Sequence, residues 1–190
     1  APDRVALGSH TSPVGFGFGV LIALLLLVIP GAVTARAGGL PLPAAVAVAP
    51  ALTYGIVALF IVPFGAIGVP WNGWSALFAA ATTAAAAAGL RKVLGRYRDR
   101  DAEQLAPARG PALIAAAGVV LGAVLIMWAA AAGIVHWQSA PSTWDSVWHA
   151  NTVRFILDTG QASPTHMGEL RNVETHDVLY YPSAFHALAA

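Results

Sequence analysis

The chain has 190 residues, of which 57% are hydrophobic and only 10% are charged, with a formal net charge of +1. A soluble domain carries about 25% charged residues, and a soluble fold of this length has too much surface for its volume to bury so many apolar side chains. Composition therefore predicts an all-α integral membrane protein and gives no case for a nucleic-acid partner. Because the chain contains no Cys, it excludes disulfides and thiolate metal sites.

A short mixed tail, residues 1–13, precedes a long apolar run over residues 14–34. As a helix, this run is long enough to cross about 30 Å of hydrocarbon. Gly15 and Gly19 have the spacing that lets a partner helix approach closely. A signal peptide is the alternative, because Ala35-Arg36-Ala37 resembles a cleavage site, but the run exceeds the roughly 7–15 apolar residues of a signal.

The second span is predicted over residues 44–67. Pro50 and Pro63 lie inside it, where neighbouring helices can satisfy the backbone groups that a proline frees. Trp71 and Trp74, in the turn that follows and just after it, are typical of an aromatic belt at the membrane interface.

The third span is predicted over residues 75–90 and consists mostly of Ala. Small residues favour a position packed between other helices, and an Ala-rich helix on the membrane surface is the alternative. The fourth span is predicted over residues 110–135, where Gly118 and Gly122 form a second closely spaced pair. The bilayer and helices packed through these glycines are thus the expected partners.

Residues 91–109 form the strongly charged linker, with six Lys or Arg against three acids. Short loops rich in Lys and Arg stay in the cytoplasm, so this loop predicts a multi-pass protein of the plasma membrane with the tail and residues 136–179 outside. From residue 180 to residue 190 the chain turns apolar again, which predicts the start of a fifth span and a longer polytopic protein.

The external loop contains a polar, helix-patterned stretch over residues 143–159. Ser142 or Thr143 suits its N-terminal cap and Gly160 its C-terminal stop. The helix is amphipathic rather than uniformly apolar, so we expect it to lie on the membrane surface.

This helix contains two pairs of ionisable residues. The two members of each pair are spaced i, i+4 and therefore lie on the same face of the helix. Asp145 and His149 form the first pair. Asp145 is either an acid that stabilises the helix N-terminus or a catalytic group. Arg154 and Asp158 form the second pair, which is interpreted as a surface ion pair with a substrate contact as the alternative.

A second polar cluster follows in the same loop and is interpreted as a solvated loop that faces sugars or headgroups. Its carboxylates and imidazoles could bind a divalent cation, which is the alternative and the one candidate cofactor, but their spacing matches no fixed metal motif. The cluster comprises His166, Glu169, Glu174, His176 and Asp177. His186 lies within the apolar end of the chain, where an ionisable group is costly and often functional.

The stretch WDSVWHANTVRFILDTG, directly after a span, resembles the first external loop of the GT-C superfamily of polytopic glycosyltransferases. The segment YYPSAFHALAA resembles the Tyr-Pro segment with which such proteins re-enter the membrane. The chain is also similar to the start of large actinobacterial multi-pass membrane proteins of the cell envelope. In the superfamily this loop follows the first span, whereas here it follows the fourth.

The resemblance implies sugar transfer from a polyprenyl-phosphate donor to a cell-envelope glycan or lipid, with Asp145 as the base. His149 is expected to orient Asp145, and Arg154 or Arg171 to pair with the donor phosphate. Tyr181 and His186 are further substrate-binding candidates. The alternative is a non-enzymatic multi-pass protein: a transporter, a flippase or an accessory subunit of a membrane complex.

Overall fold

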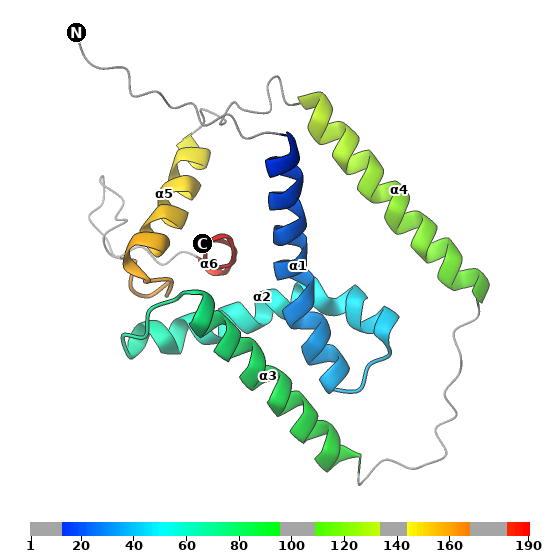
Figure 1. Cartoon of the computed structure of the whole chain (residues 1–190), viewed down its shortest axis with the longest axis horizontal. Coiled ribbons are helices and arrows are strands. Elements are labelled where there is room, and N and C mark those ends of the chain that lie inside the picture. Colours follow the sequence, from blue (N-terminus) through cyan, green and yellow to red (C-terminus); the bar gives the residue numbers. More distant parts are fainter. Residues whose placement is uncertain (1–12, 96–108, 134–143, 168–181) are drawn as a thin grey trace. The chain divides into compact units, whose positions relative to one another are not determined.

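The computed structural model describes residues 13–95, 109–133, 144–167 and 182–190, and within these ranges it contains six helices and no strand (Figure 1). In chain order the helices are α1 (Pro13–Ala37), α2 (Leu42–Ala66), α3 (Gly73–Leu94), α4 (Arg109–Gly133), α5 (Trp144–Thr159) and α6 (Ala184–Ala189). The all-α prediction is confirmed for this part of the chain.

Three of these helices are long and apolar enough to cross a membrane: Gly17–Ala37 within α1, all of α2, and all of α3. Each exceeds the roughly 20 residues that span about 30 Å of hydrocarbon. They correspond to the spans predicted over residues 14–34, 44–67 and 75–90. The protein is therefore a membrane protein with three helices of spanning length in its described residues.

Helix α4 belongs to a separate compact unit, residues 98–141. It has 25 residues, but its continuous apolar part among the described residues, Ala116–Ala129, is shorter than a span needs. The fourth span thus stays a prediction.

Helices α1 and α2 approach each other closely at Gly31. A Cβ atom at this position would lie 2.0 Å from the carbonyl oxygen of Ala49, so only glycine fits there. The backbone N–H of Gly31 also donates to Oγ1 of the buried Thr53 at 3.0 Å. A small residue and a polar bond are the means by which helices associate in an apolar solvent.

Helix α2 runs between two different ends of the unit formed by α1, α2, α3, α5 and α6. Its N-terminus follows a turn in which Gly39 (φ 100°) lies against the side chain of Arg91 of α3. Near its C-terminus, Gly65 lies against Ser163, where an added Cβ would clash with that side chain. Its 25 residues separate these two ends by about 37 Å.

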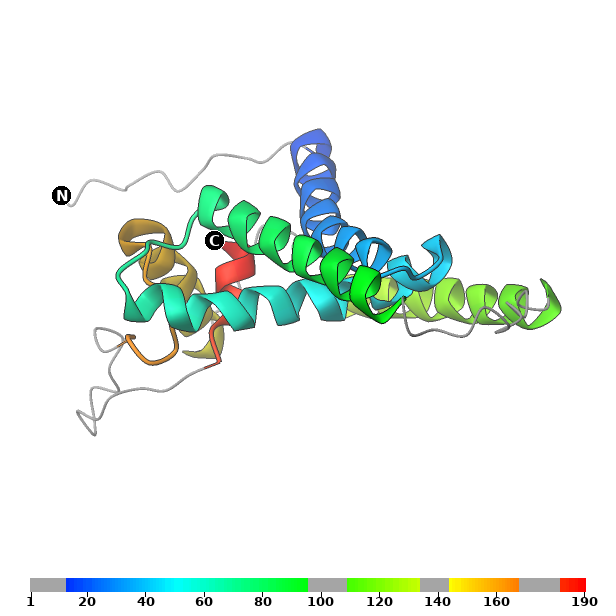
Figure 2. The same cartoon turned by 90° about the horizontal axis from the view of Figure 1, so that it is seen from below.

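The buried apolar core lies at the C-terminal end of α2. It is made by side chains from α2, the α2–α3 turn, α5, the segment after α5, and α6: Val57, Ile61, Trp71, Ile156, Ala162, Met167 and Ala187. Both views show α6 beside α2 and α5 (Figures 1 and 2). The core therefore attaches the predicted external segments to the spanning helices.

Candidate functional site

Helix α5 ends as the sequence predicts. Gly160 follows its last residue with φ 70°, and its N–H donates to the carbonyl of Ile156 at 2.8 Å. Glycine adopts this left-handed conformation without the steric cost that other residues meet. The predicted caps, Ser142 and Thr143, lie outside the described residues.

The carbonyl of Gly160 fixes α5 to the α2–α3 turn, because it accepts a 2.7 Å bond from the N–H of Trp71. A Cβ at Gly160 would lie 2.6 Å from Cβ of Pro70. Thr152 and Ile156 on the inner face of α5 are fully buried. The amphipathic pattern predicts that this face of α5 lies on the membrane surface. At Thr152 and Ile156 the face instead packs against the protein itself.

The side chain of Trp71 joins the α2–α3 turn to α6. Its Nε1 donates to the carbonyl of Ala187 at 2.8 Å, and the residue is only 7% exposed. Trp71 is therefore a core residue, and its assignment to an interfacial aromatic belt is wrong. Trp74 is 82% exposed, as the belt requires.

The segment after α5 is held by a second polar contact with the chain that leads into α6. Oγ of the buried Ser183 donates to the carbonyl of Ala162 at 2.5 Å. Ser163 is fully buried beside Gly65. Serine and glycine at these positions carry no pattern that sequence reasoning detects, because their partners are 21 or more residues away.

His149 of α5 and His186 of α6 form the polar centre of this junction. Nδ1 of His149 and Nε2 of His186 are 2.8 Å apart, and the rings are stacked with their centroids at 5.0 Å. The ring of Trp148 meets both imidazoles edge-on, each at 5.6 Å.

His186 is 1% exposed and belongs to α6, which is outside the three helices of spanning length. Burial lowers the pKa of His186, and a positive charge on His149 lowers it further. A bond between two imidazoles needs one N–H and one lone pair, so it requires at least one neutral ring.

Asp145 is exposed in the first turn of α5, where the helix dipole favours a negative charge. Among the described residues, no hydrogen bond or ion pair joins Asp145 to His149. The hydrogen bond between His149 and His186 holds α5 at a position one helical turn away from Asp145. The expected orienting role of His149 stays a prediction.

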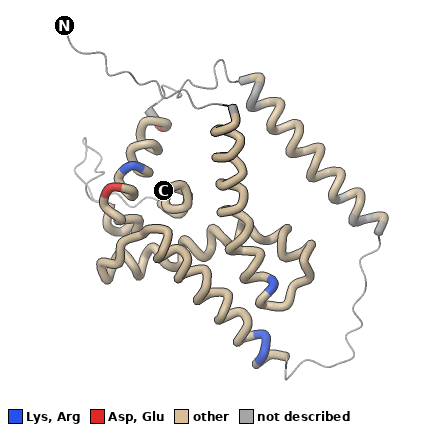
Figure 3. The backbone as a smooth tube through the Cα atoms, viewed as in Figure 1, with Lys and Arg blue, Asp and Glu red and all other residues tan. Residues whose placement is uncertain are grey.

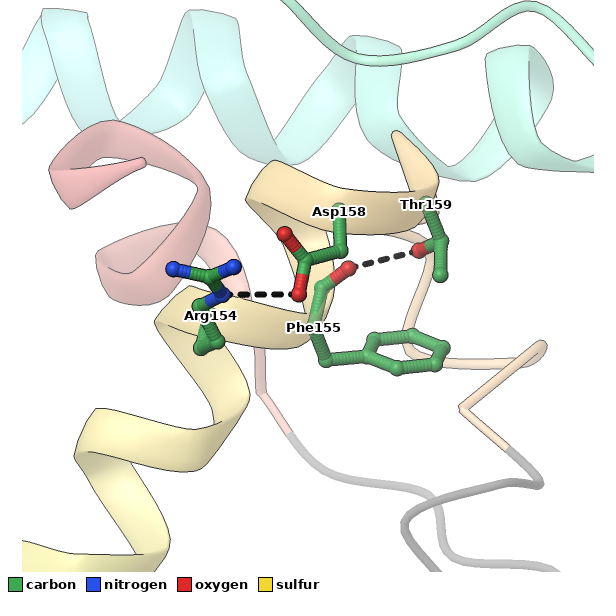
Figure 4. Close-up of polar contacts among 4 residues, drawn as sticks. All are labelled: Arg154, Phe155, Asp158 and Thr159. Carbon is green, nitrogen blue, oxygen red and sulfur yellow. Dashed lines mark hydrogen bonds and ion pairs between the residues drawn. The ribbon is translucent and has the colours of Figure 1, made fainter.

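Arg154 and Asp158 form the surface ion pair that their spacing predicts (Figure 4). Nε of Arg154 donates to Oδ2 of Asp158 at 2.7 Å, and the side chains are 75% and 54% exposed. The hydrogen bond to Asp158 raises the pKa of Arg154. One turn on, Oγ1 of Thr159 donates to the carbonyl of Phe155 at 2.7 Å.

The other predicted site residues are only partly within the described chain. Arg171 and Tyr181 lie outside it, as do Glu169, Glu174, His176 and Asp177. His166 is described, is exposed, and its Nδ1 is 2.8 Å from Oγ1 of Thr165. No three His, Asp or Glu side chains gather to hold a metal ion in the described ranges, and the divalent cation stays an untested alternative.

A Cβ added at Gly19 would meet nothing within 4 Å, and neither would one added at Gly118 or Gly122 within the separate unit of α4. Packing of the predicted glycine pairs against partner helices stays a prediction. Gly31 and Gly65 do lie where helices or loops approach closely, and sequence spacing does not single them out.

A model of a family of unknown function (DUF6541) matches residues 24–190 of the chain. No curated protein and no solved structure matches it.

Proposed function

The chain belongs to this family of unknown function, DUF6541, and we propose that it is a membrane-embedded glycosyltransferase of the GT-C kind. The donor is a sugar on a polyprenyl phosphate, and the acceptor is a hydroxyl of a cell-envelope glycan or lipid. The proposal rests on one observation: Asp145, the acid that the sequence resemblance designates, is exposed at the start of a helix anchored to the spanning helices.

The proposed orientation has α5 on the outer face of the plasma membrane. Arg36 and Arg91 both reach the turn that precedes α2, and Lys92 follows Arg91 on α3. Figure 3 shows the blue Lys and Arg segments of α1 and α3 at the C-terminal ends of these helices, away from α5. Loops rich in Lys and Arg stay in the cytoplasm. About 37 Å of helix then separates the cytoplasmic end from the core that holds α5. In this orientation α4 is the fourth span, leading out from the basic loop.

The chemistry assigned to Asp145 is that of a general base. Its carboxylate takes the proton of the acceptor hydroxyl while that oxygen bonds to the anomeric carbon of the sugar. The bond from the anomeric carbon to the lipid phosphate breaks, and the phosphate leaves with the electron pair. An exposed carboxylate is accessible to an acceptor from the aqueous side, which is what this step needs.

The contacts within the junction hold the helix that carries Asp145 in a fixed position. The His149–His186 bond lies one helical turn from Asp145, and the Gly160–Trp71 bond holds the other end of α5. A catalytic group gains from a rigid support because its effective concentration depends on its position. In this proposal His149 therefore acts by positioning α5.

The test is Asp145→Asn in the full protein, with Asp158→Asn as the matched control on the same helix. The proposal expects Asp145→Asn to lower transfer of labelled sugar from polyprenyl phosphate by about a hundredfold or more, the usual contribution of a general base. Asp158→Asn should lower it little. Unchanged transfer by folded Asp145→Asn protein would refute the catalytic role.

A transporter is the second candidate, and the continuity of the spanning helices argues against it. Transporters bind their substrates where spanning helices are broken near the midplane. Here α1 continues through Pro30, and α2 continues through Pro50 and Pro63. Uptake of substrate into vesicles by the purified protein, without sugar transfer, would favour this candidate instead.

A further inference from the structure

The α1–α2 turn gathers cations from two helices. Nη1 of Arg36, in the last turn of α1, donates to the carbonyl of Leu40 at 2.6 Å. Arg91 reaches the same turn from the C-terminal end of α3, because a Cβ at Gly39 would lie 2.9 Å from its Nε and 3.3 Å from its Cζ. Lys92 follows directly, and all three residues are exposed.

No carboxylate balances these three charges within the described chain, because its only acidic residues are Asp145 and Asp158 on α5. The adjoining sequence over residues 96–108 has three Arg against two Asp and one Glu and is neutral overall. A topology signal requires only that cations be present in the loop. It does not require cations from two helices to meet on one turn, where they repel each other unless an anion binds.

Apolar side chains accompany the cations on α3. Leu90, Val93 and Leu94 are between 53% and 58% exposed beside Arg91 and Lys92. The site therefore combines guanidinium groups, which suit a phosphate because of their fixed fork of donors, with a surface for acyl chains at the end of a spanning helix. Free phosphate would use only the first of these features.

We propose that Arg36, Arg91 and Lys92 bind the headgroup phosphate of an anionic phospholipid, whose acyl chains lie along the C-terminal end of α3. Gly39 is favoured at this site because its φ of 100° strains any other residue, and a Cβ there would push the end of the Arg91 side chain aside. The site is distinct from Asp145 and does not depend on the proposed transfer reaction.

The test measures binding of short-chain phosphatidylglycerol to the purified full chain in detergent, with short-chain phosphatidylcholine and inorganic phosphate as the other probes. Phosphatidylglycerol should bind saturably and more tightly than both. Each of Arg36→Gln, Arg91→Gln and Lys92→Gln should weaken it about fivefold, and the triple variant about a hundredfold, from the usual contribution of one basic residue near an anionic lipid surface.

Arg36→Lys and Arg91→Lys are the matched controls: they keep the charge but lose the fork of donors, so each should bind more tightly than the corresponding Gln variant and less tightly than the unchanged chain. Lys92→Gln protects the test against misfolding, since removal of this exposed side chain breaks no contact described above. Equal affinity for phosphatidylcholine, or full affinity in folded Lys92→Gln and in the triple variant, would overturn the proposal. Inorganic phosphate that binds as tightly as phosphatidylglycerol would overturn the lipid assignment.

Discussion

Nδ1 of His149 and Nε2 of His186 lie 2.8 Å apart although 37 residues separate them in the chain. The bond ties α5 to α6 inside a protein core, with the edge of Trp148 against both rings. Because at least one ring must stay neutral for the bond to form, the junction responds to pH.

We expect the protein to lose stability as the pH falls below about 6.5, the ordinary pKa of histidine. The pKa of His186 is lowered in the folded state, so the unfolded chain binds a proton more readily and acid favours unfolding. The stability that neutral His186 contributes is complete above pH 6.5 and is lost as the pH falls through the lowered pKa of His186. The melting temperature measured across this range should show the loss, and His186→Gln should flatten it. An equally steep profile in that variant would contradict the assignment.

Trp71→Phe should destabilise the protein by about 1–3 kcal/mol, because it leaves the buried carbonyl of Ala187 without its indole donor. Trp74→Phe is the matched control. Its side chain is 82% exposed, and the same change there should alter stability by less than about 0.5 kcal/mol. Denaturation of both variants in the same detergent checks this, and equal effects would mean that the Trp71 bond contributes nothing.

Gly160→Ala should cost more than Gly68→Ala, although the two glycines have nearly the same φ, 70° and 73°. Each alanine meets the left-handed backbone penalty of about 1–2 kcal/mol. Only at Gly160 does the new Cβ also approach Pro70, at 2.6 Å, whereas Gly68 faces open space. The difference between their free energies of unfolding isolates the steric part, and a difference of zero would show that the α5 end is free to move.

The proposed orientation is tested with single cysteines, since the chain has none of its own. Asn151→Cys, on the exposed side of α5, should react with an impermeant maleimide in intact cells, and Gly95→Cys, which caps α3, only after permeabilisation. Ser163 is a poor probe because it is fully buried. The reverse pattern of labelling would invert the protein in the membrane.

The spanning helices could be predicted because their signal is local. Mostly apolar runs of 16 to 24 residues mark α1 to α3, and a glycine after a helical pattern marks the end of α5 at Gly160. The bond between Arg154 and Asp158 was equally predictable, since i, i+4 spacing alone brings the side chains together.

The candidate site could not be predicted to the same extent because its contacts join distant segments. The nearest ionisable neighbour of His149 in sequence terms is Asp145, yet its observed hydrogen-bond partner is His186 on another helix. Trp71 has the sequence setting of an interfacial residue, and it is buried in part by α5 and α6, which lie far along the chain. A helix that lies on a membrane surface and a helix that packs against protein have the same sequence pattern, because both helices are amphipathic.

The bond between Trp71 and Ala187 can form only late in biosynthesis, since 116 residues separate donor and acceptor. At about 5–20 residues per second, the ribosome makes Ala187 roughly 6–23 s after Trp71. In that interval the α2–α3 turn exists without the helices that cover its indole. This end of the protein is thus completed late, and a nascent chain halted before residue 187 presents an exposed tryptophan that a chaperone or a quality-control protease can recognise.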